Sequence, residues 1–201
     1  MLSVLVALLG ALIPTIFYVL FLWWLDRYEK EPVWLLALAF AWGAVPAAFL
    51  SIVAEVAFDA SITLVAGESL LADLASVSVS APLVEESAKG VALIALVLLF
   101  RREFDNVLDG IIYGAMIGFG FALTENVFAY FLPILSSEGL GAGLTNIFMR
   151  TVVFGFNHAF WTATTGAAHG RRPCTRLGRS SRCSSPDCSN DPHSCWWPRP
   201  T

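Results

Sequence analysis

The sequence predicts an all-α integral membrane protein, a polytopic bundle of about five transmembrane helices. Hydrophobic residues make up 57% of the chain and charged residues only 14%, a balance far from that of soluble domains. The apolar residues also form long stretches, and a helix needs about 20 of them to cross a hydrocarbon core of about 30 Å. The expected spans are residues 2–25, 33–54, 80–100, 110–135 and 144–168.

The first stretch is expected to be a retained span rather than a cleaved signal. It has no basic region before its apolar run, and the run is too long for a secretory signal. Trp23, Trp24 and Trp34 flank the first connection, and aromatic side chains favour the level of the lipid headgroups. We therefore expect a multi-pass protein of the cell membrane, in contact with the lipid bilayer.

Basic residues predict the orientation of the bundle. They lie in the first and third connections and after the fifth stretch, whereas the second and fourth connections have none. By the positive-inside rule the odd connections are cytoplasmic and the N-terminus lies outside. The net charge of -4 and the small number of basic residues give no support for nucleic-acid binding. The basic residues concerned are Arg27, Lys30, Arg101, Arg102, Arg171 and Arg172.

A change in composition at Gly170 predicts two segments. We expect residues 1–170 to form a transmembrane domain. Residues 171–201 form a tail rich in Cys, Arg, Pro and Ser, which holds all four cysteines and five of the ten prolines. The cysteines contain no CxxC pair, so a metal site is disfavoured. We expect the tail to be disordered or to be translated out of frame.

The third stretch carries an unusual group of charges, Glu85, Glu86 and Lys89. A charged side chain at the bilayer centre costs at least about 2.5 to 3.5 kcal/mol, so such groups need partners or a purpose. The spacings of three and four place Lys89 beside both carboxylates on neighbouring helix faces. If the lysine neutralises one carboxylate, the other is suited to act as a general base. The alternative is an interfacial ion-pair cluster near a helix start.

Two further polar sites lie in the fourth and fifth stretches. Glu125 comes about 15 Å and His158 about 21 Å below the same membrane surface at 1.5 Å per helical residue. Glycines before Glu125 would let a neighbouring helix approach closely. Taken singly, Glu125 with Asn126 fits a hydrogen-bonded packing pair, and His158 fits a structural histidine. Their conjunction with Glu85 and Glu86 favours a catalytic site in the membrane.

These glutamates and the histidine are suited to activating a water molecule for attack on a peptide carbonyl, with or without a metal. Zinc is the expected metal, because glutamate oxygen and imidazole nitrogen are among its ligands. The tentative ligands are Glu125, His158 and one of Glu85 or Glu86, with Glu86 preferred. No HExxH motif occurs, so local spacing does not define a metal site.

The ordered motifs resemble those of the PrsW family of intramembrane proteases, which is related to the CAAX-endopeptidase and bacteriocin-processing superfamily. They are DRYEKEP, the EExxK motif with Glu85, Glu86 and Lys89, the segment DGIIYGAMIGFGFALTEN, and NHAFWT. The resemblance implies hydrolysis of a peptide bond within the membrane, with anti-sigma factors as a substrate type. It also implies that Glu85, Glu86, Glu125 and His158 are the catalytic or metal-coordinating groups.

Family members usually continue into further spans that contain another histidine, and here the cysteine-rich tail takes that place. The resemblance therefore implies that residues 1–170 form a transmembrane, protease-like domain that is incomplete at its C-terminal end. A catalytically inactive scaffold of the same family is therefore one alternative. A proton- or ion-coupled transporter is the other, because buried carboxylates also serve proton relays. No inverted repeat is visible in support of a transporter.

Overall fold

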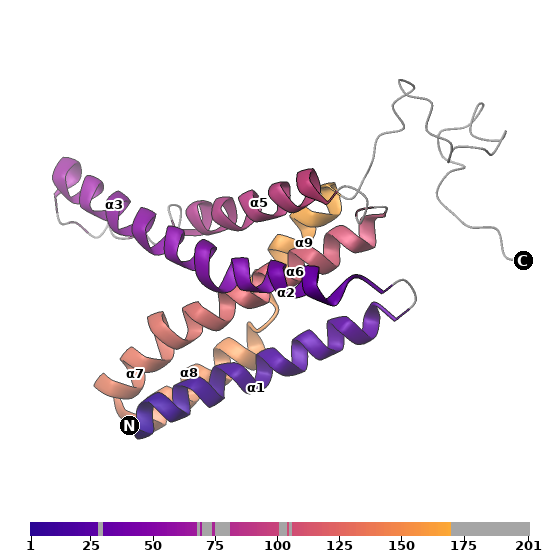
Figure 1. The fold of residues 1–201 in the computed structure, drawn as a ribbon. Helices are drawn as coiled ribbons and strands as arrows, with labels where there is room; N and C mark the ends of the chain where they lie inside the picture. The colour runs from indigo at the N-terminus through magenta and orange to yellow at the C-terminus, as the bar shows by residue number, and fades with distance from the viewer. Residues whose placement is uncertain are drawn as a thin grey trace, which may run out of the picture.

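The structure is a computed structural model that describes residues 1–27, 30–67, 81–100 and 106–169, together with Ser69, Leu74 and Phe104. The predicted tail, residues 171–201, lies outside them. No strand occurs among the described residues, so the prediction of an all-α fold is confirmed (Figure 1). The elements are α1 (Leu2–Leu25), α2 (Val33–Trp42), η1 (Gly43–Ala47), α3 (Ala48–Ala66), α5 (Ala81–Leu99), α6 (Val107–Glu125), η3 (Asn126–Phe131), α7 (Leu132–Ser137), α8 (Gly139–Phe148), η4 (Met149–Val153) and α9 (Asn157–His169), in which η denotes a π-helical segment.

Four helical stretches of the described chain are long and apolar enough to cross a membrane. They are Leu2–Leu25, Val33–Leu64, Val107–Ser137 and Gly139–Ala168. The helix α5 has 19 residues and coincides with the predicted third stretch. It is not among these four, and it carries three charged side chains. The prediction of a polytopic helical bundle is therefore confirmed.

The second stretch was predicted to end at residue 54, which is wrong, because the helix continues to Ala66. Glu55 and Asp59 are compatible with a helix, and nothing before Gly67 breaks it. Gly67 ends the helix with a φ of 70°, a left-handed conformation that favours glycine.

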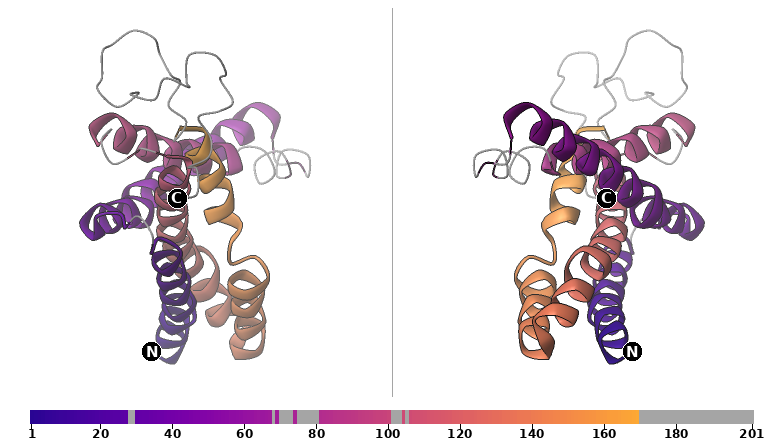
Figure 2. Two further views of the ribbon diagram at one scale, coloured as in Figure 1. Left: turned by 90° about the vertical axis from the view of Figure 1, so that its right-hand side faces the viewer. Right: turned by 90° about the vertical axis from the view of Figure 1, so that its left-hand side faces the viewer.

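The fifth stretch was predicted to be one helix, but it is interrupted at residues 154–156. The π-helical η4 ends at Val153, and α9 begins at Asn157. Gly155 fits this turn because an added Cβ would lie 2.1 Å from the carbonyl oxygen of Thr151. The hydroxyl of Tyr18 in α1 donates a hydrogen bond to the same carbonyl. In Figure 2, α8 and α9 follow one another along one side of the bundle, on either side of this turn.

Helix α6 lies at the centre of the bundle and continues through η3 into α7. It runs between α2 and α3 on one side and α1 on the other (Figure 1), and it packs mainly on α9, α2 and η1. Two glycines allow the close approach of α9. An added Cβ on Gly114 would lie 2.4 Å from the carbonyl oxygen of Thr162, and one on Gly118 would lie 2.6 Å from Cα of Ala159. This contact brings the end of α6 beside the start of α9.

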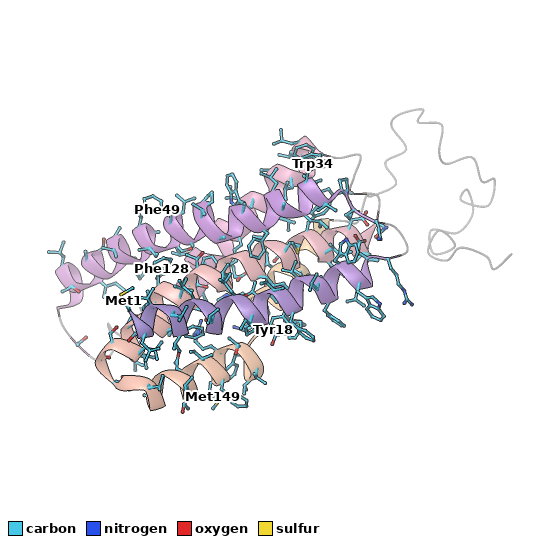
Figure 3. The ribbon with its side chains drawn as sticks, turned by 60° about the horizontal axis from the view of Figure 1, so that its bottom comes forward. Met1, Tyr18, Trp34, Phe49, Phe128 and Met149 are labelled. Atoms are coloured by element: carbon cyan, nitrogen blue, oxygen red, sulfur yellow. The ribbon has the colours of Figure 1, made fainter. Side chains whose placement is uncertain are left out.

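The outer surface of the bundle carries large apolar side chains (Figure 3). Phe49, Phe128 and Met149 are examples from three different helical stretches, and each is exposed. At the end of α1, Arg27 lies 4.8 Å from the ring of Trp24, and Lys30 lies 4.3 Å from the ring of Trp23. An apolar surface that ends in tryptophans and basic residues is suited to a lipid bilayer.

Candidate active site

Helix α5 supplies two glutamates and one lysine to a polar cluster inside the bundle. Lys89 is completely buried, and its Nζ lies 2.8 Å from Oε1 of Glu86 and 3.3 Å from Oε2 of Glu85. The spacings of three and four residues bring these groups together on one side of the helix, as the sequence predicted. The lysine serves both carboxylates rather than one.

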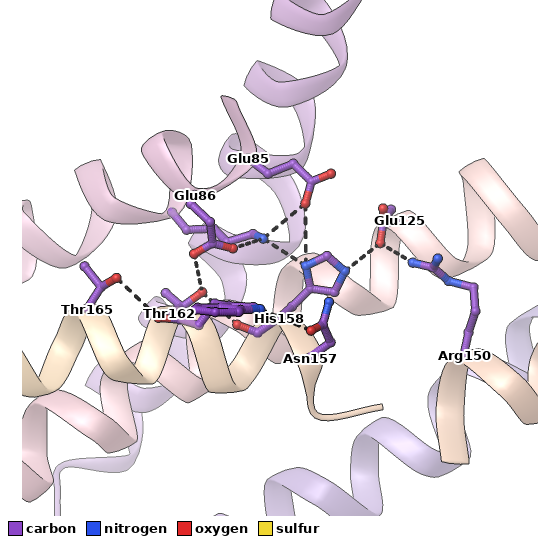
Figure 4. Close-up of polar contacts among 10 residues, drawn as sticks. Glu85, Glu86, Glu125, Arg150, Asn157, His158, Thr162 and Thr165 are labelled. Atoms are coloured by element: carbon purple, nitrogen blue, oxygen red, sulfur yellow. Dashed lines mark hydrogen bonds and ion pairs between the residues drawn. The ribbon is translucent and has the colours of Figure 1, made fainter. Parts of the chain in front are cut away.

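Helix α9 places His158 between the charges of α5 and those of α6 (Figure 4). Its Nδ1 lies 2.9 Å from Nζ of Lys89 and 3.5 Å from Oε2 of Glu85. Its Nε2 lies 3.0 Å from Oε2 of Glu125. Because an ammonium group can only donate, this geometry assigns Nδ1 as the acceptor and leaves the proton on Nε2, directed at Glu125. The ring thus links Lys89 to Glu125 as a neutral imidazole.

The carboxylate of Glu125, the last residue of α6, is held by a second donor. Nη2 of Arg150 lies 2.6 Å from Oε2 of Glu125, and Nε of Arg150 lies 2.6 Å from Oδ1 of Asn126. The guanidinium also lies 3.4 Å from the centre of the Tyr130 ring. Asn126 therefore supports the site through Arg150.

Two uncharged side chains complete the cluster. The hydroxyl of Thr162 lies 3.3 Å from Oε2 of Glu86 and 2.9 Å from the carbonyl oxygen of His158. The Phe121 ring lies under the cluster, with its centre 3.9 Å from Nζ of Lys89 and 5.3 Å from the imidazole centre. The aromatic face stabilises the buried ammonium group.

The acids of the cluster outnumber its permanent cations. Three carboxylates face one lysine and one arginine, while the histidine is neutral in the assigned tautomer. A further acid, Glu55 of α3, interacts electrostatically with Glu85 and Glu125. Such an excess of negative charge in an apolar bundle is costly unless a proton or a cation neutralises it. The three carboxylates are those of Glu85, Glu86 and Glu125.

The donor set fits a divalent metal. One ligand atom each from Glu85, Glu125 and His158 lie within 4.8 Å of one another. Two carboxylate oxygens and an imidazole nitrogen are ligand types that catalytic zinc takes from proteins, and three such ligands leave a position open. Glu86, the preferred glutamate of the sequence prediction, lies outside this group and contacts Lys89 and Thr162.

Sequence reasoning missed Arg150 and Glu55. Arg150 is an arginine within the apolar stretch 144–168, and Glu55 is an acid within the second long helix. The high cost of an intramembrane charge applied to both and could have identified them. Their partners could not have been identified from spacing, because they lie on other helices.

The fold and the cluster define a class of protein, a helical membrane protein with carboxylates and a histidine gathered among its membrane helices. The model of the family described as PrsW family intramembrane metalloprotease matches residues 31–185, which is most of the chain. The chain belongs to this family. The match includes the cluster residues of α5, α6, η4 and α9, so membership supports a membrane protease. No curated protein and no solved structure gave a significant match to the chain.

Proposed function

We propose that this protein is an intramembrane endopeptidase that hydrolyses a peptide bond of a membrane-associated protein with an activated water molecule. The observation that carries the proposal is the meeting of Glu85, Glu125 and His158, whose ligand atoms come together from three helices. Each is only about 15% exposed in its side chain, at 15%, 14% and 15% respectively. A purely structural bundle gains little from gathering such groups.

Glu86 is proposed as the general base. Its side chain is 33% exposed, more than that of Glu85. It also lies outside the group of Glu85, Glu125 and His158 that could hold a metal. Nζ of Lys89 donates a hydrogen bond to Oε1 of Glu86, and the hydroxyl of Thr162 contacts Oε2. In the reaction Glu86 takes a proton from the water as the oxygen attacks the peptide carbonyl. It then returns a proton to the leaving amine nitrogen, which balances the hydrolysis.

Glu85, Glu125 and His158 are proposed to hold the metal, with zinc as the candidate. If a divalent ion were held there, it would act as a Lewis acid toward the substrate carbonyl. Lys89 forms ion pairs with both Glu85 and Glu86 and keeps their carboxylates in place. Residues 1–170 are proposed to form the protease domain in the cell membrane, with the N-terminus outside. The proposed substrate is a membrane protein of the anti-sigma-factor type, which the sequence resemblance suggests.

A cleavage assay on the full chain in proteoliposomes, with a single-span membrane protein as substrate, tests the proposal. Glu86→Gln, Glu125→Gln and His158→Ala should each abolish cleavage without preventing membrane insertion. Glu138→Gln is the matched control, because Glu138 is an exposed acid between α7 and α8. Cleavage retained in all three site variants would contradict the assignment. Ion uptake by a wild-type protein that cleaves nothing would favour a transporter.

A further inference from the structure

Arg150 contacts three side chains from one short segment at the end of α6. It binds Glu125 and Asn126 through two different nitrogens, each at 2.6 Å, and it lies over the ring of Tyr130. The side chain is mostly buried, at 23% exposure. The planar guanidinium carries donors on several edges, so it can bind two acceptors while its face covers an aromatic ring. A lysine offers one point charge and could not make all three contacts.

The contact is made between two π-helical segments. Arg150 lies in η4, whereas Asn126 and Tyr130 lie in η3, which begins directly after Glu125. Such segments are rare and often occur at functional sites. Pro133 follows η3 closely and has no N–H to donate to the preceding turn, which favours a locally widened helix. The wider turns of η3 and η4 therefore lie at the point where the two segments contact each other through Arg150.

Two donors from successive helical segments, η4 and α9, lie beside the Oε2 atom of Glu125. Arg150 Nη2 approaches it at 2.6 Å from η4, and His158 Nε2 approaches it at 3.0 Å from α9. These donors lie before and after the turn at residues 154–156. Removing the guanidinium would leave a largely buried carboxylate without its cation and free it to rotate away from His158.

We propose that Arg150 is a positioning residue for the hydrolysis. It holds the Glu125 carboxylate in place and directs it toward His158, so that its oxygen faces the group formed by Glu85, Glu125 and His158. Arg150 itself does not touch the reacting atoms. This inference rests on the proposed function, because it assigns Arg150 a role through Glu125 at the same site.

The test compares Arg150→Met and Arg150→Lys with the wild-type chain in proteoliposomes. Zinc affinity is measured by competition with a chromophoric chelator, and kcat and KM are measured with a fluorogenic single-span substrate. We expect Arg150→Met to weaken zinc binding and to lower kcat by about 10- to 100-fold, the usual effect of losing a residue that orients a metal ligand. KM should stay within about twofold, and Arg150→Lys should lie between the two.

Two further variants make the result specific. Met149→Ala changes the exposed neighbour of Arg150 in η4 and should leave both measurements unchanged. Adding Arg150→Met to Glu125→Gln should weaken zinc binding no further, because the arginine acts through that carboxylate. Wild-type zinc affinity and kcat in Arg150→Met would overturn the inference, and so would an equal loss in the Glu125→Gln background.

The failure of the proposed function has a different signature. A wild-type chain that neither cleaves nor binds zinc contradicts the proposed function. Whether Arg150 holds Glu125 is then tested by the unfolding equilibrium constants of the wild type, Glu125→Gln, Arg150→Met and the double variant. If the fold-changes in the unfolding equilibrium constant of the two single variants multiply in the double variant, the two residues act independently and the inference is overturned. A smaller combined change would support it.

Discussion

Nζ of Lys89 lies 2.9 Å from Nδ1 of His158, and both side chains lie near the ring of Phe121. The lysine is completely buried and also contacts Glu85 and Glu86. One ammonium group therefore joins the acids of α5 to the histidine of α9. Because it donates to Nδ1 of His158, Lys89 and a metal bound at that nitrogen would compete for the same lone pair.

Replacing Lys89 with methionine should destabilise the protein by about 3 kcal/mol, because it leaves buried carboxylates without their cation. The loss should be smaller in the double variant Glu86→Gln, Lys89→Met, which removes one negative charge together with the positive one. Unfolding of the protein in mixed micelles with increasing SDS measures both. Added zinc should stabilise Lys89→Met more than the wild type, because the ion then no longer competes with Lys89 for His158. Equal stabilisation by zinc would contradict this competition.

Removing the metal should abolish cleavage reversibly. A chelator such as 1,10-phenanthroline should inhibit the wild-type chain by removing the ion. Zinc added after dialysis should restore activity, because the proposed ligands remain in the protein and can bind the ion again. In Glu125→Gln, zinc should restore nothing. The proteoliposome cleavage assay gives the readout, with a non-chelating isomer of the phenanthroline as control. Full activity at chelator excess would argue for water activation by Glu86 and His158 without a metal.

A Cβ added at Gly118 should impair the site by separating α6 from α9. In Gly118→Ala the new atom would lie 2.6 Å from Cα of Ala159, the neighbour of His158, and backbone atoms cannot move aside as a flexible side chain does. A displacement of about 1 Å at reacting groups can lower a rate by about 100-fold, and we expect kcat to fall on that order. Gly90→Ala is the matched control, because its added Cβ would meet no atom of another helix within 4 Å. Equal kcat values for the two variants would show that the close packing does not position His158.

Stability should depend on pH through Glu31, which lies between α1 and α2. Burial raises the pKa of its carboxyl from 4.5 to about 7, with the nearby Asp109 adding to the rise and the hydrogen bond from the Tyr113 hydroxyl, at 2.5 Å, opposing it. Between pH 4.5 and 7 the folded protein binds more protons at this site than the unfolded chain does. The free energy of unfolding should therefore fall as the pH rises through this window.

Glu31→Gln removes this titration and keeps an oxygen that accepts from Tyr113. At pH 8 the variant should be more stable than the wild type by about 1 kcal/mol, a value discounted for the partial exposure of the site, and at pH 4.5 the two should be nearly equal. Unfolding curves at the two pH values provide the measurement. A difference between the proteins that is the same at both pH values would contradict the assigned pKa.

The helices were predictable where hydrophobicity alone defines them. The predicted first stretch agrees with α1 at both ends, because Leu2 and Leu25 bound a largely apolar run without any charged residue. The ends of other helices depended on local backbone chemistry. The second stretch ends only at Gly67, and the fifth is divided by a turn that Gly155 and a hydrogen bond from Tyr18 accommodate.

The predicted site residues lie together in the structure, but their individual roles depend on geometry that spacing does not supply. Adjacent residues of a helix point about 100° apart, so the rotation of α5 decides that Glu85, rather than Glu86, lies with Glu125 and His158. Arg150 reaches Asn126 from another helical stretch, through π-helical turns that a pattern of regular helices does not anticipate.

The two donors to Glu125 lie only a short distance apart in the chain, with the turn at residues 154–156 between them. Because Arg150 and His158 meet at one oxygen atom, the number of residues between them is fixed more strictly than their identity. One residue inserted into or deleted from a helical part of that segment would rotate one donor by about 100° and move it along the axis by about 1.5 Å. This stretch of sequence should therefore accept substitutions far more readily than changes in length.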